Sequence, residues 1–167
     1  IKTTGLPIAV NVSPKQFLHK DFVNTVVATL RDADAPTHLL FIEITENLLL
    51  HDHEAVTGVM KQLNQLGVNF SIDDFGTGYS NLRRLQLLPV TELKIDREFV
   101  QNAFESHRDR NLLDSMILMA RHMRLSIVAE GVEEKRQADY LRDSGVDQLQ
   151  GFYFHKPSPI SEWLKTF

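Results

Sequence analysis

The sequence predicts an α/β fold in which a parallel β-sheet is covered by helices, and three observations support this prediction. Short apolar runs alternate along the chain with amphipathic stretches. The runs are almost continuously hydrophobic, which is typical of strands buried on both faces of a parallel sheet. Each run also ends in a polar side chain. Six strands are predicted, over residues 7–12, 39–44, 68–72, 92–95, 125–129 and 148–154.

Helical patterns occupy the segments between the predicted strands. A helix begins after the first strand, because Ser13, Pro14 and Gln16 form a capping box with proline at the first helical position. The next helix begins at Asp52 or His53 and ends at Gly67. Two further amphipathic helices are predicted, over residues 112–123 and 134–143.

The composition is that of one globular domain of 167 residues, with 43% hydrophobic and 24% charged residues. The net charge of −4 argues against a nucleic-acid polymer as partner. The absence of cysteine excludes disulfides and thiolate zinc sites, and it is compatible with a cytoplasmic location. No apolar run approaches the roughly 20 residues of a membrane-spanning helix. Because the chain begins at Ile1, we expect it to be part of a longer protein, which a segment outside this chain could anchor to a membrane.

Polar residues stand where the predicted strands end. They are Asn11, Glu43, Asp73, Asp74, Lys94, Asp96, Glu130, Glu133 and Gln150. A single polar residue at a strand end is explained equally well by exposure to solvent. Polar ends on six strands are harder to explain in that way, because in a parallel barrel all these ends lie on the face that carries the active site.

The residue types at the strand ends favour metal-dependent phosphoryl chemistry. Several carboxylates at one barrel mouth repel each other unless cations lie between them. Carboxylate and asparagine oxygens are ligands that Mg²⁺ and Mn²⁺ prefer. The adjacent Asp73 and Asp74 would allow one carboxylate to bridge two ions about 4 Å apart, an arrangement suited to phosphodiester hydrolysis. Lys94 would then offset charge that develops on the phosphoryl group.

Six motifs occur in the order seen in a known bacterial family. They are Asn11-Val12-Ser13, Glu43-Ile44-Thr45-Glu46, residues 73–80, Lys94-Ile95-Asp96, residues 129–133 and Gln150-Gly151. In these motifs the chain resembles EAL domains over essentially its whole length. The resemblance implies a TIM-like (β/α) barrel, incomplete here, with about six of its eight strands and the first two missing. Residues 1–167 would then form the C-terminal two-thirds of a single EAL domain.

The resemblance also implies an activity, the metal-dependent hydrolysis of cyclic-di-GMP to linear 5′-pGpG. By the family's pattern, Asn11, Glu43 and Asp73 would hold one Mg²⁺ or Mn²⁺ ion. Asp73, Asp74 and Glu130 would hold a second ion, and a metal-bound water would be the nucleophile.

The resemblance assigns further roles around the metals. Lys94 and Gln150 would place water and phosphate, and Glu130 is also a candidate base. Asp96 and Glu133 would support this set from nearby, and Glu46 would brace loop 74–80. Asn11, Gln150 and Tyr153 are the residues expected to contact substrate.

The partners implied by the resemblance are cyclic-di-GMP, a second copy of the chain docked through the region of loop 74–80, and an upstream sensory or GGDEF domain. The Glu-Ala-Leu motif that names the family is absent from these residues. An alternative is therefore a catalytically inactive cyclic-di-GMP receptor or interaction module, which would follow if that glutamate is also absent from the parent protein. A third possibility is that residues 1–167 alone are only a folding remnant.

Three other patterns are weighed and set aside. Asp74-Phe75-Gly76 and His107-Arg108-Asp109 match kinase motifs, but their order is reversed and no glycine-rich loop precedes them, so residues 107–110 are predicted to begin a helix. The sequence His51-Asp52-His53 is interpreted as a capping loop in preference to a zinc site, because no further ligands converge there. Aromatic residues 152–154 are more often core than stacking platforms, and only Tyr153 is retained for substrate.

Overall fold

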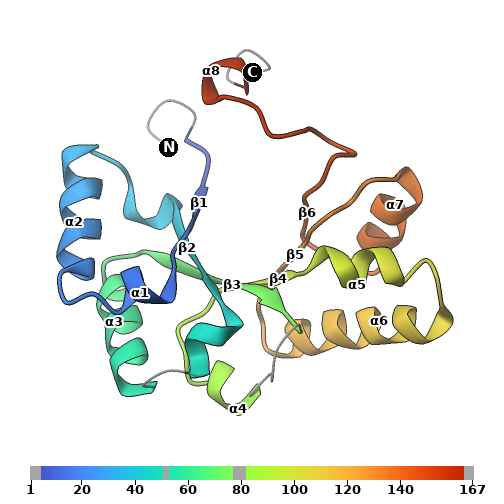
Figure 1. The fold of residues 1–167 in the computed structure, drawn as a ribbon, viewed down its shortest axis with the longest axis horizontal. Helices are drawn as coiled ribbons and strands as arrows, with labels where there is room; N and C mark the ends of the chain where they lie inside the picture. The colour runs from blue at the N-terminus through green and yellow to red at the C-terminus, as the bar shows by residue number, and fades with distance from the viewer. Residues whose placement is uncertain (1–4, 51–52, 77–81, 164–167) are drawn as a thin grey trace.

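A single curved sheet forms the centre of the computed structural model, which describes residues 5–50, 53–76 and 82–163. The sheet contains six parallel strands in chain order, each hydrogen-bonded to the next. They are β1 (Ile8–Asn11), β2 (Leu40–Thr45), β3 (Asn69–Phe75), β4 (Glu92–Ile95), β5 (Ser126–Ala129) and β6 (Gln148–Leu149). Figure 1 shows the strands curving into an open half-barrel with helices around its outside. The predicted incomplete TIM-like barrel is confirmed.

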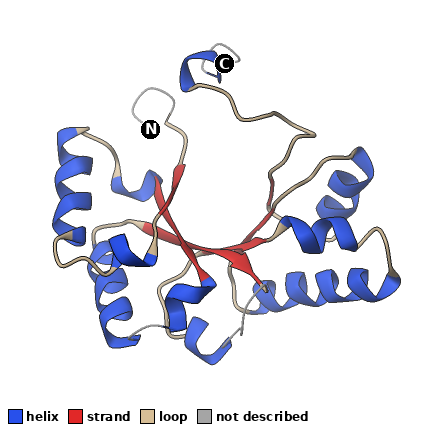
Figure 2. Cartoon of the chain, viewed as in Figure 1, coloured by secondary structure: helices blue, strands red, loops and turns tan. Residues whose placement is uncertain are grey.

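Helices cover the outer side of this sheet in Figure 2. The α-helices are α1 (Pro14–Phe17), α2 (Phe22–Asp32), α3 (His53–Gln65), α4 (Leu82–Leu85), α5 (Arg97–Asn102), α6 (His107–His122), α7 (Lys135–Asp143) and α8 (Ile160–Trp163). Two short 3₁₀ helices, η1 (Thr37–Leu39) and η2 (Glu46–Leu50), flank β2. No helix of the described segments is long and apolar enough to cross a membrane.

The two faces of the sheet differ because successive side chains of a strand point to opposite sides. The outward positions are apolar and fully or nearly fully buried under the helices, among them Ile42, Ile44, Phe70, Ile72 and Leu93. Each such side chain stabilises the fold by about 1.5–3 kcal/mol relative to an exposed one. The inward positions include Glu43, Ser71, Asp73, Glu92 and Lys94, all of them buried. Apolar and polar residues therefore alternate in β2, β3 and β4, and the prediction of nearly continuous hydrophobicity was wrong for the inner face of these three strands.

Helix starts follow their capping residues. Ser13 accepts from the Gln16 amide, so the predicted capping box of α1 is confirmed. Helix α6 begins at His107, where residues 107–110 were predicted to begin a helix, and it continues through the predicted amphipathic stretch 112–123; the Ser106 side chain caps it by accepting from the Asp109 amide. Helix α7 begins directly after Glu134, as predicted. Helix α2 was not predicted, although one face of it buries Leu30 against the sheet.

The predicted sixth strand over residues 148–154 was wrong beyond Leu149. The Gly151 backbone approaches Val132 so closely that a Cβ at this position would lie 2.1 Å from the Val132 carbonyl oxygen. The chain then turns, and the Tyr153 amide donates to the same carbonyl at 2.9 Å. Aromatic residues 152–154 have the composition of a strand, but they form part of this turn and are exposed.

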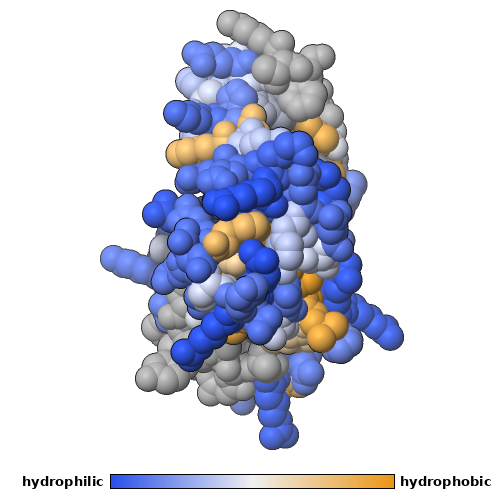
Figure 3. Space-filling view, turned by 90° about the vertical axis from the view of Figure 1, so that its right-hand side faces the viewer, coloured by the Kyte–Doolittle hydropathy of each residue, from blue (hydrophilic) through white to orange (hydrophobic). Residues whose placement is uncertain are grey.

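Figure 3 shows the side of the molecule formed by the helices on the right of Figure 1, which are α5, α6 and α7. This face is mostly hydrophilic and carries small, separate hydrophobic areas. Leu112 and Leu118 of α6 are among the exposed large hydrophobic residues of the chain. Isolated apolar side chains of this kind are usual on the surface of a globular domain.

Candidate metal centre

Three carboxylates converge on one ammonium group on the inner side of the sheet. Lys94 Nζ lies 2.8 Å from Glu43 Oε1, 3.1 Å from Asp73 Oδ1 and 2.7 Å from Glu130 Oε1. The four residues come from β2, β3, β4 and the position directly after β5, so they are brought together by the parallel order of the strands. The sequence placed all four at this end of the sheet, and the structure joins them in one cluster.

A bulge in β3 positions the two adjacent aspartates. Ile72 pairs with Leu93, but Phe75 pairs with Ile95, so β3 uses three steps where β4 uses two. Asp73 and Asp74 therefore both lie opposite Lys94, and Asp74 adopts a left-handed backbone with φ 54°. In a regular strand neighbouring side chains would point to opposite faces. The bulge removes this constraint, as bulges often do near active sites.

The pKa values of the cluster reflect burial and crowded negative charge. Burial raises the pKa of the Glu130 carboxyl; hydrogen bonding to Lys94 opposes the shift, while Asp73 and Glu43 add to it. Burial, then Asp73 and Asp96, raise the pKa of Asp74. Burial acts to lower the pKa of the Lys94 ammonium, but its hydrogen bonds to Glu130 and Glu43 outweigh burial, so its pKa is raised. The lysine is therefore charged, and it does not fully compensate the carboxylates around it.

Asn11 and Gln150 lie at the two edges of the described sheet. Asn11 pairs with Glu43 in the β1–β2 register, so its side chain shares the inward face with that carboxylate. Gln150 follows β6, and its backbone N–H donates to the Ala129 carbonyl at 2.8 Å. Both residues are exposed. They are placed at the same end of the sheet as the cluster, and no direct contact joins either side chain to it among the described residues.

The residues expected to support the site are held by their own contacts. Glu46 Oε2 accepts from the Gly76 amide at 3.2 Å, the contact that bracing of the following loop requires. Asp96 caps α5 by accepting from the Glu98 amide at 2.7 Å, and it lies near enough to Asp74 to raise its pKa. Glu133 accepts from Gln101 Nε2 at 3.2 Å. Residues 77–80 of the predicted loop lie outside the described residues.

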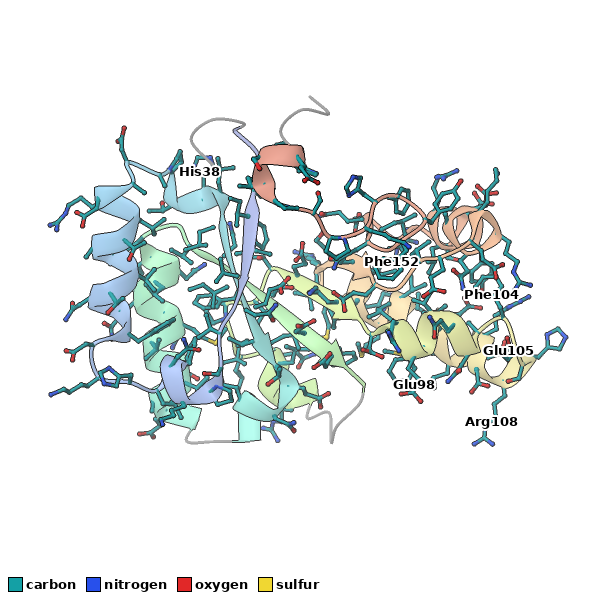
Figure 4. All side chains as sticks on the ribbon, turned by 45° about the horizontal axis from the view of Figure 1, so that its top comes forward. His38, Glu98, Phe104, Glu105, Arg108 and Phe152 are labelled. Carbon is teal, nitrogen blue, oxygen red and sulfur yellow. The ribbon has the colours of Figure 1, made fainter. Side chains whose placement is uncertain are left out.

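Several other predicted features lie away from the cluster. Tyr153 is exposed and stacks edge-on against Phe154, with ring centroids 5.1 Å apart. Phe152, labelled in Figure 4, is exposed beside the Lys156 ammonium. Arg108 points away from the strands in the same view, and residues 107–109 form the first turn of α6, as predicted. The segment His51-Asp52 lies outside the described residues, so the zinc alternative stays untested there.

Sequence reasoning missed a second polar layer beneath the cluster. Ser71 and Glu92 face each other in the β3–β4 register, one step deeper than Lys94, and both are buried. Glu92 Oε2 accepts from Gln148 Nε2 at 3.2 Å, and burial raises the pKa of the Glu92 carboxyl. A hydrogen bond from the Ser71 hydroxyl opposes this shift. The alternation of residues 69–73 and 92–95 was the signal that could have revealed this layer.

The donor set fits a hard divalent cation. Glu43, Asp73, Asp74 and Glu130 offer carboxylate oxygens, and three of these four residues already contact a cationic group, the Lys94 ammonium. Within residues 5–50, 53–76 and 82–163, no three such side chains are arranged around a free metal position, because the carboxylates converge on the lysine. The chemistry of the donors therefore matches metal binding, and their geometry is centred on Lys94 Nζ.

Comparison with known sequences gives a consistent family assignment. The family model of the EAL domain matches residues 2–157. The chain is 42% identical over 160 residues to the bifunctional diguanylate cyclase/cyclic di-GMP phosphodiesterase MucR of Pseudomonas aeruginosa, covering 95% of the chain and 23% of MucR. It is 31% identical to the cyclic di-GMP phosphodiesterase PdeR of Escherichia coli, covering 99% of the chain and 26% of PdeR. The chain thus spans about a quarter of the length of these relatives.

Solved structures show the same fold. A phosphodiesterase structure of PaMucR in complex with c-di-GMP matches with a TM-score of 0.90 and 39% identity, covering 94% of this chain and 64% of that one. The EAL enzyme Bd1971, in a form with cAMP and cyclic-di-GMP bound, matches with a TM-score of 0.92 and 34% identity. That match covers 96% of this chain and 42% of Bd1971. The half-barrel is therefore one part of a larger arrangement in both structures.

Proposed function

Because the chain belongs to the EAL domain family, we propose that it hydrolyses cyclic-di-GMP to linear 5′-pGpG by two-metal phosphodiester cleavage. The observation that carries the proposal is the convergence of Glu43, Asp73 and Glu130 on Lys94 at the carboxyl ends of the strands. This is the face on which barrel enzymes carry their chemistry. The names of the relatives MucR and PdeR support cyclic-di-GMP as the substrate.

The residues divide into metal ligands and groups that act on the substrate. Asn11, Glu43 and Asp73 would hold one Mg²⁺ or Mn²⁺ ion, and Asp73, Asp74 and Glu130 would hold the other. Bound there, the ions would supply an activated water and offset the negative charge of the phosphate. The bulge in β3 supports the shared use of Asp73 and Asp74, because both lie opposite the same residue of β4.

Proton transfer and phosphate binding fall to the chain's own side chains. Glu130 is also the candidate base that would take a proton from the attacking water, since its carboxylate lies in the cluster, 2.7 Å from Lys94 Nζ. Lys94 is charged and buried, so its ammonium would donate to a phosphate oxygen in a site of low dielectric. Gln150 and Asn11 flank this position and would bind the substrate, with Tyr153 available to a base. Asp96, Glu133 and Glu46 would keep the set in place.

The decisive experiment is turnover of cyclic-di-GMP by the full-length protein with Mn²⁺, with pGpG followed by chromatography. Asp73→Asn is the matched variant, because it keeps the shape of the side chain and removes the shared carboxylate. We expect pGpG from the wild-type protein and strongly reduced turnover from the variant. A wild-type protein as inert as the variant would contradict the enzymatic proposal.

A receptor without catalysis is the second candidate. It would follow if the glutamate of the Glu-Ala-Leu motif, which is expected to complete the first metal site, is also absent from the parent protein. Calorimetry that shows binding of cyclic-di-GMP by the full-length protein, without turnover, would favour the receptor.

The remaining partners belong to the same proposal. A second copy of the chain would dock through the region of loop 74–80, and a sensory or GGDEF domain would precede this domain. The share of the relatives that the chain covers supports the presence of further domains in the parent protein. The substrate would be met in the cytoplasm.

A further inference from the structure

The Lys94 ammonium uses the same carboxylates that are proposed as metal ligands. Its three ion pairs, between 2.7 and 3.1 Å, involve Glu43, Asp73 and Glu130. The lysine side chain is 6% exposed, and the three partners are between 8% and 18% exposed. A buried ion pair of this geometry is screened very little by salt. The contacts are therefore strong enough to compete with another cation.

The cluster carries more negative charge than one ammonium can balance. Three carboxylates contact the single Lys94 ammonium. Asp74 adds a fourth carboxylate, because the bulge places it with Asp73 opposite Lys94. The carboxylates thus retain an attraction for further positive charge, and a divalent ion would satisfy it better than a monovalent ammonium.

We propose that the Lys94 ammonium is a built-in competitor of the divalent ions: it holds Glu43, Asp73 and Glu130 together in the metal-free protein and weakens metal binding. This inference rests on the proposed function, since it takes the identity of the metal ligands from it. Metal binding then draws carboxylate oxygens away from Lys94 and repels its charge. At least one N–H group of the Lys94 ammonium then no longer donates to a carboxylate, and it can donate to a phosphate oxygen while the ammonium stays charged.

A lysine with this role affects metal affinity and metal-free stability in opposite directions. Without its charge, the carboxylates repel each other in the metal-free protein, and the fold becomes less stable. The same loss removes the competitor, so a divalent ion binds more tightly. A lysine that acts only on the phosphate would leave metal affinity unchanged in the absence of substrate.

The test measures Mn²⁺ binding by the full-length protein in the absence of cyclic-di-GMP. Lys94→Met keeps the length of the side chain and removes its charge. Lys135→Met is the matched control, because Lys135 is an exposed lysine whose ion pair with Asp139 lies on the surface of α7. After removal of metal by a chelator, titration calorimetry gives the dissociation constant for Mn²⁺, and circular dichroism gives the melting temperature with and without Mn²⁺.

For Lys94→Met we expect the dissociation constant for Mn²⁺ to fall by about tenfold or more. We also expect a lower melting temperature without metal and a larger rise on adding Mn²⁺ than in the wild type. The control should match the wild type in all three values. Equal or weaker Mn²⁺ binding by a folded Lys94→Met protein would overturn the inference alone. Failure of the wild type itself to bind Mn²⁺ would overturn the metal site of the proposed function as well.

If Lys94→Met does not fold, the inference can still be tested on the wild-type protein. Crystal structures without metal and with Mn²⁺ would be compared at Lys94 Nζ. The inference requires at least one of the three ion pairs to open beyond 4 Å when Mn²⁺ is bound. Retention of all three contacts would overturn it.

Discussion

Glu46 Oε2 accepts a hydrogen bond from the Gly76 amide at 3.2 Å, which ties the end of β2 to the residue directly after the β3 bulge. Gly76 has a φ of 97°, and a Cβ at this position would lie 2.9 Å from the Phe99 ring. The backbone that carries Asp73 and Asp74 is thus held by one carboxylate on the inner side and by close packing on the outer side. Four predictions follow from contacts of this kind in and beneath the site.

Glu46→Ala removes the acceptor for the Gly76 amide. Residues that orient metal ligands without binding the metal are worth about 10–100-fold in activity when they are lost. We expect turnover of cyclic-di-GMP to fall within that range, while Glu46→Gln, which retains an acceptor oxygen, recovers part of the loss. Steady-state kinetics of both variants, with melting temperatures as a control for folding, test this. Equal losses in the two variants would show that the acceptor oxygen is not the cause.

Asp73→Asn removes the carboxylate proposed to be shared by both metal ions. Turnover is expected to fall by more than about 100-fold, beyond the cost of losing an orienting residue. The metal-free fold should be no less stable than the wild type, because one of several mutually repelling carboxylates has become neutral. Chelation should abolish wild-type turnover and Mn²⁺ should restore it, whereas the variant should respond weakly to Mn²⁺.

Glu92→Gln is expected to stabilise the protein at neutral pH by about 1 kcal/mol, because it removes a buried charge and keeps an acceptor for Gln148. Burial raises the pKa of the Glu92 carboxyl above its ordinary value of 4.5, so the folded state binds this proton more tightly than the unfolded state. The charged form therefore destabilises the fold above the raised pKa. The advantage of the variant should fade as the pH falls through that pKa toward 4.5.

Urea unfolding at several pH values measures this difference in the free energy of unfolding. Glu105→Gln is the matched control, since Glu105, labelled in Figure 4, is exposed in the turn between α5 and α6. The control should show no such pH-dependent gain. A stability difference for Glu92→Gln that does not change with pH would contradict the assignment of the effect to the buried charge.

Gly151→Ala and Gly58→Ala should act in opposite directions. A Cβ on Gly151 would lie 2.1 Å from the Val132 carbonyl oxygen and 2.3 Å from its amide nitrogen, so the turn after β6 must shift. Overpacking of this kind costs about 1–3 kcal/mol, and it should also displace Gln150 and lower turnover. A Cβ on Gly58, within α3, meets nothing within 4 Å among the described atoms, so alanine should add about 0.5–1 kcal/mol. Thermal unfolding of both variants tests the pair.

The half-barrel fold and the cluster of carboxylates around Lys94 could be predicted from the sequence for physical reasons. Parallel strands bring their carboxyl ends to one edge, so Glu43, Asp73, Lys94 and Glu130 were placed together without any coordinates. The end of the sheet was not within reach, because residues 152–154 have strand-like composition and Gly151 alone carries the signal for a turn. Helix α2 was missed although the sequence carries its signals: Asp21 is a common N-cap residue, and Phe22, Val26 and Leu30 follow at helical spacing.

Finer features of the site depend on register. Ser71 and Glu92 face each other only because β3 and β4 pair at those positions, and no local pattern gives the pairing of two strands. The bulge could not be predicted for the same reason. The sequence shows only that Asp73 and Asp74 are adjacent acids, and the pairing with β4 is needed to show that both lie opposite Lys94. The ion pairs of Lys94 could not be predicted from the sequence either, because the positions of strand ends indicate which residues are close and not which oxygen a side chain contacts.

The extra residue of β3 also changes which side of the sheet the following residues of the strand face. Asp73 faces the polar interior, and Phe75, which a regular strand would turn to the same side, is buried in the core instead. Gly76 then lies directly against Phe99 of α5 and Met116 of α6. Only three peptide units separate Gly76, which these helices contact, from the interior carboxylate of Asp73. The backbone of β3 therefore joins the packing of the outer helices directly to the position of the proposed metal ligands.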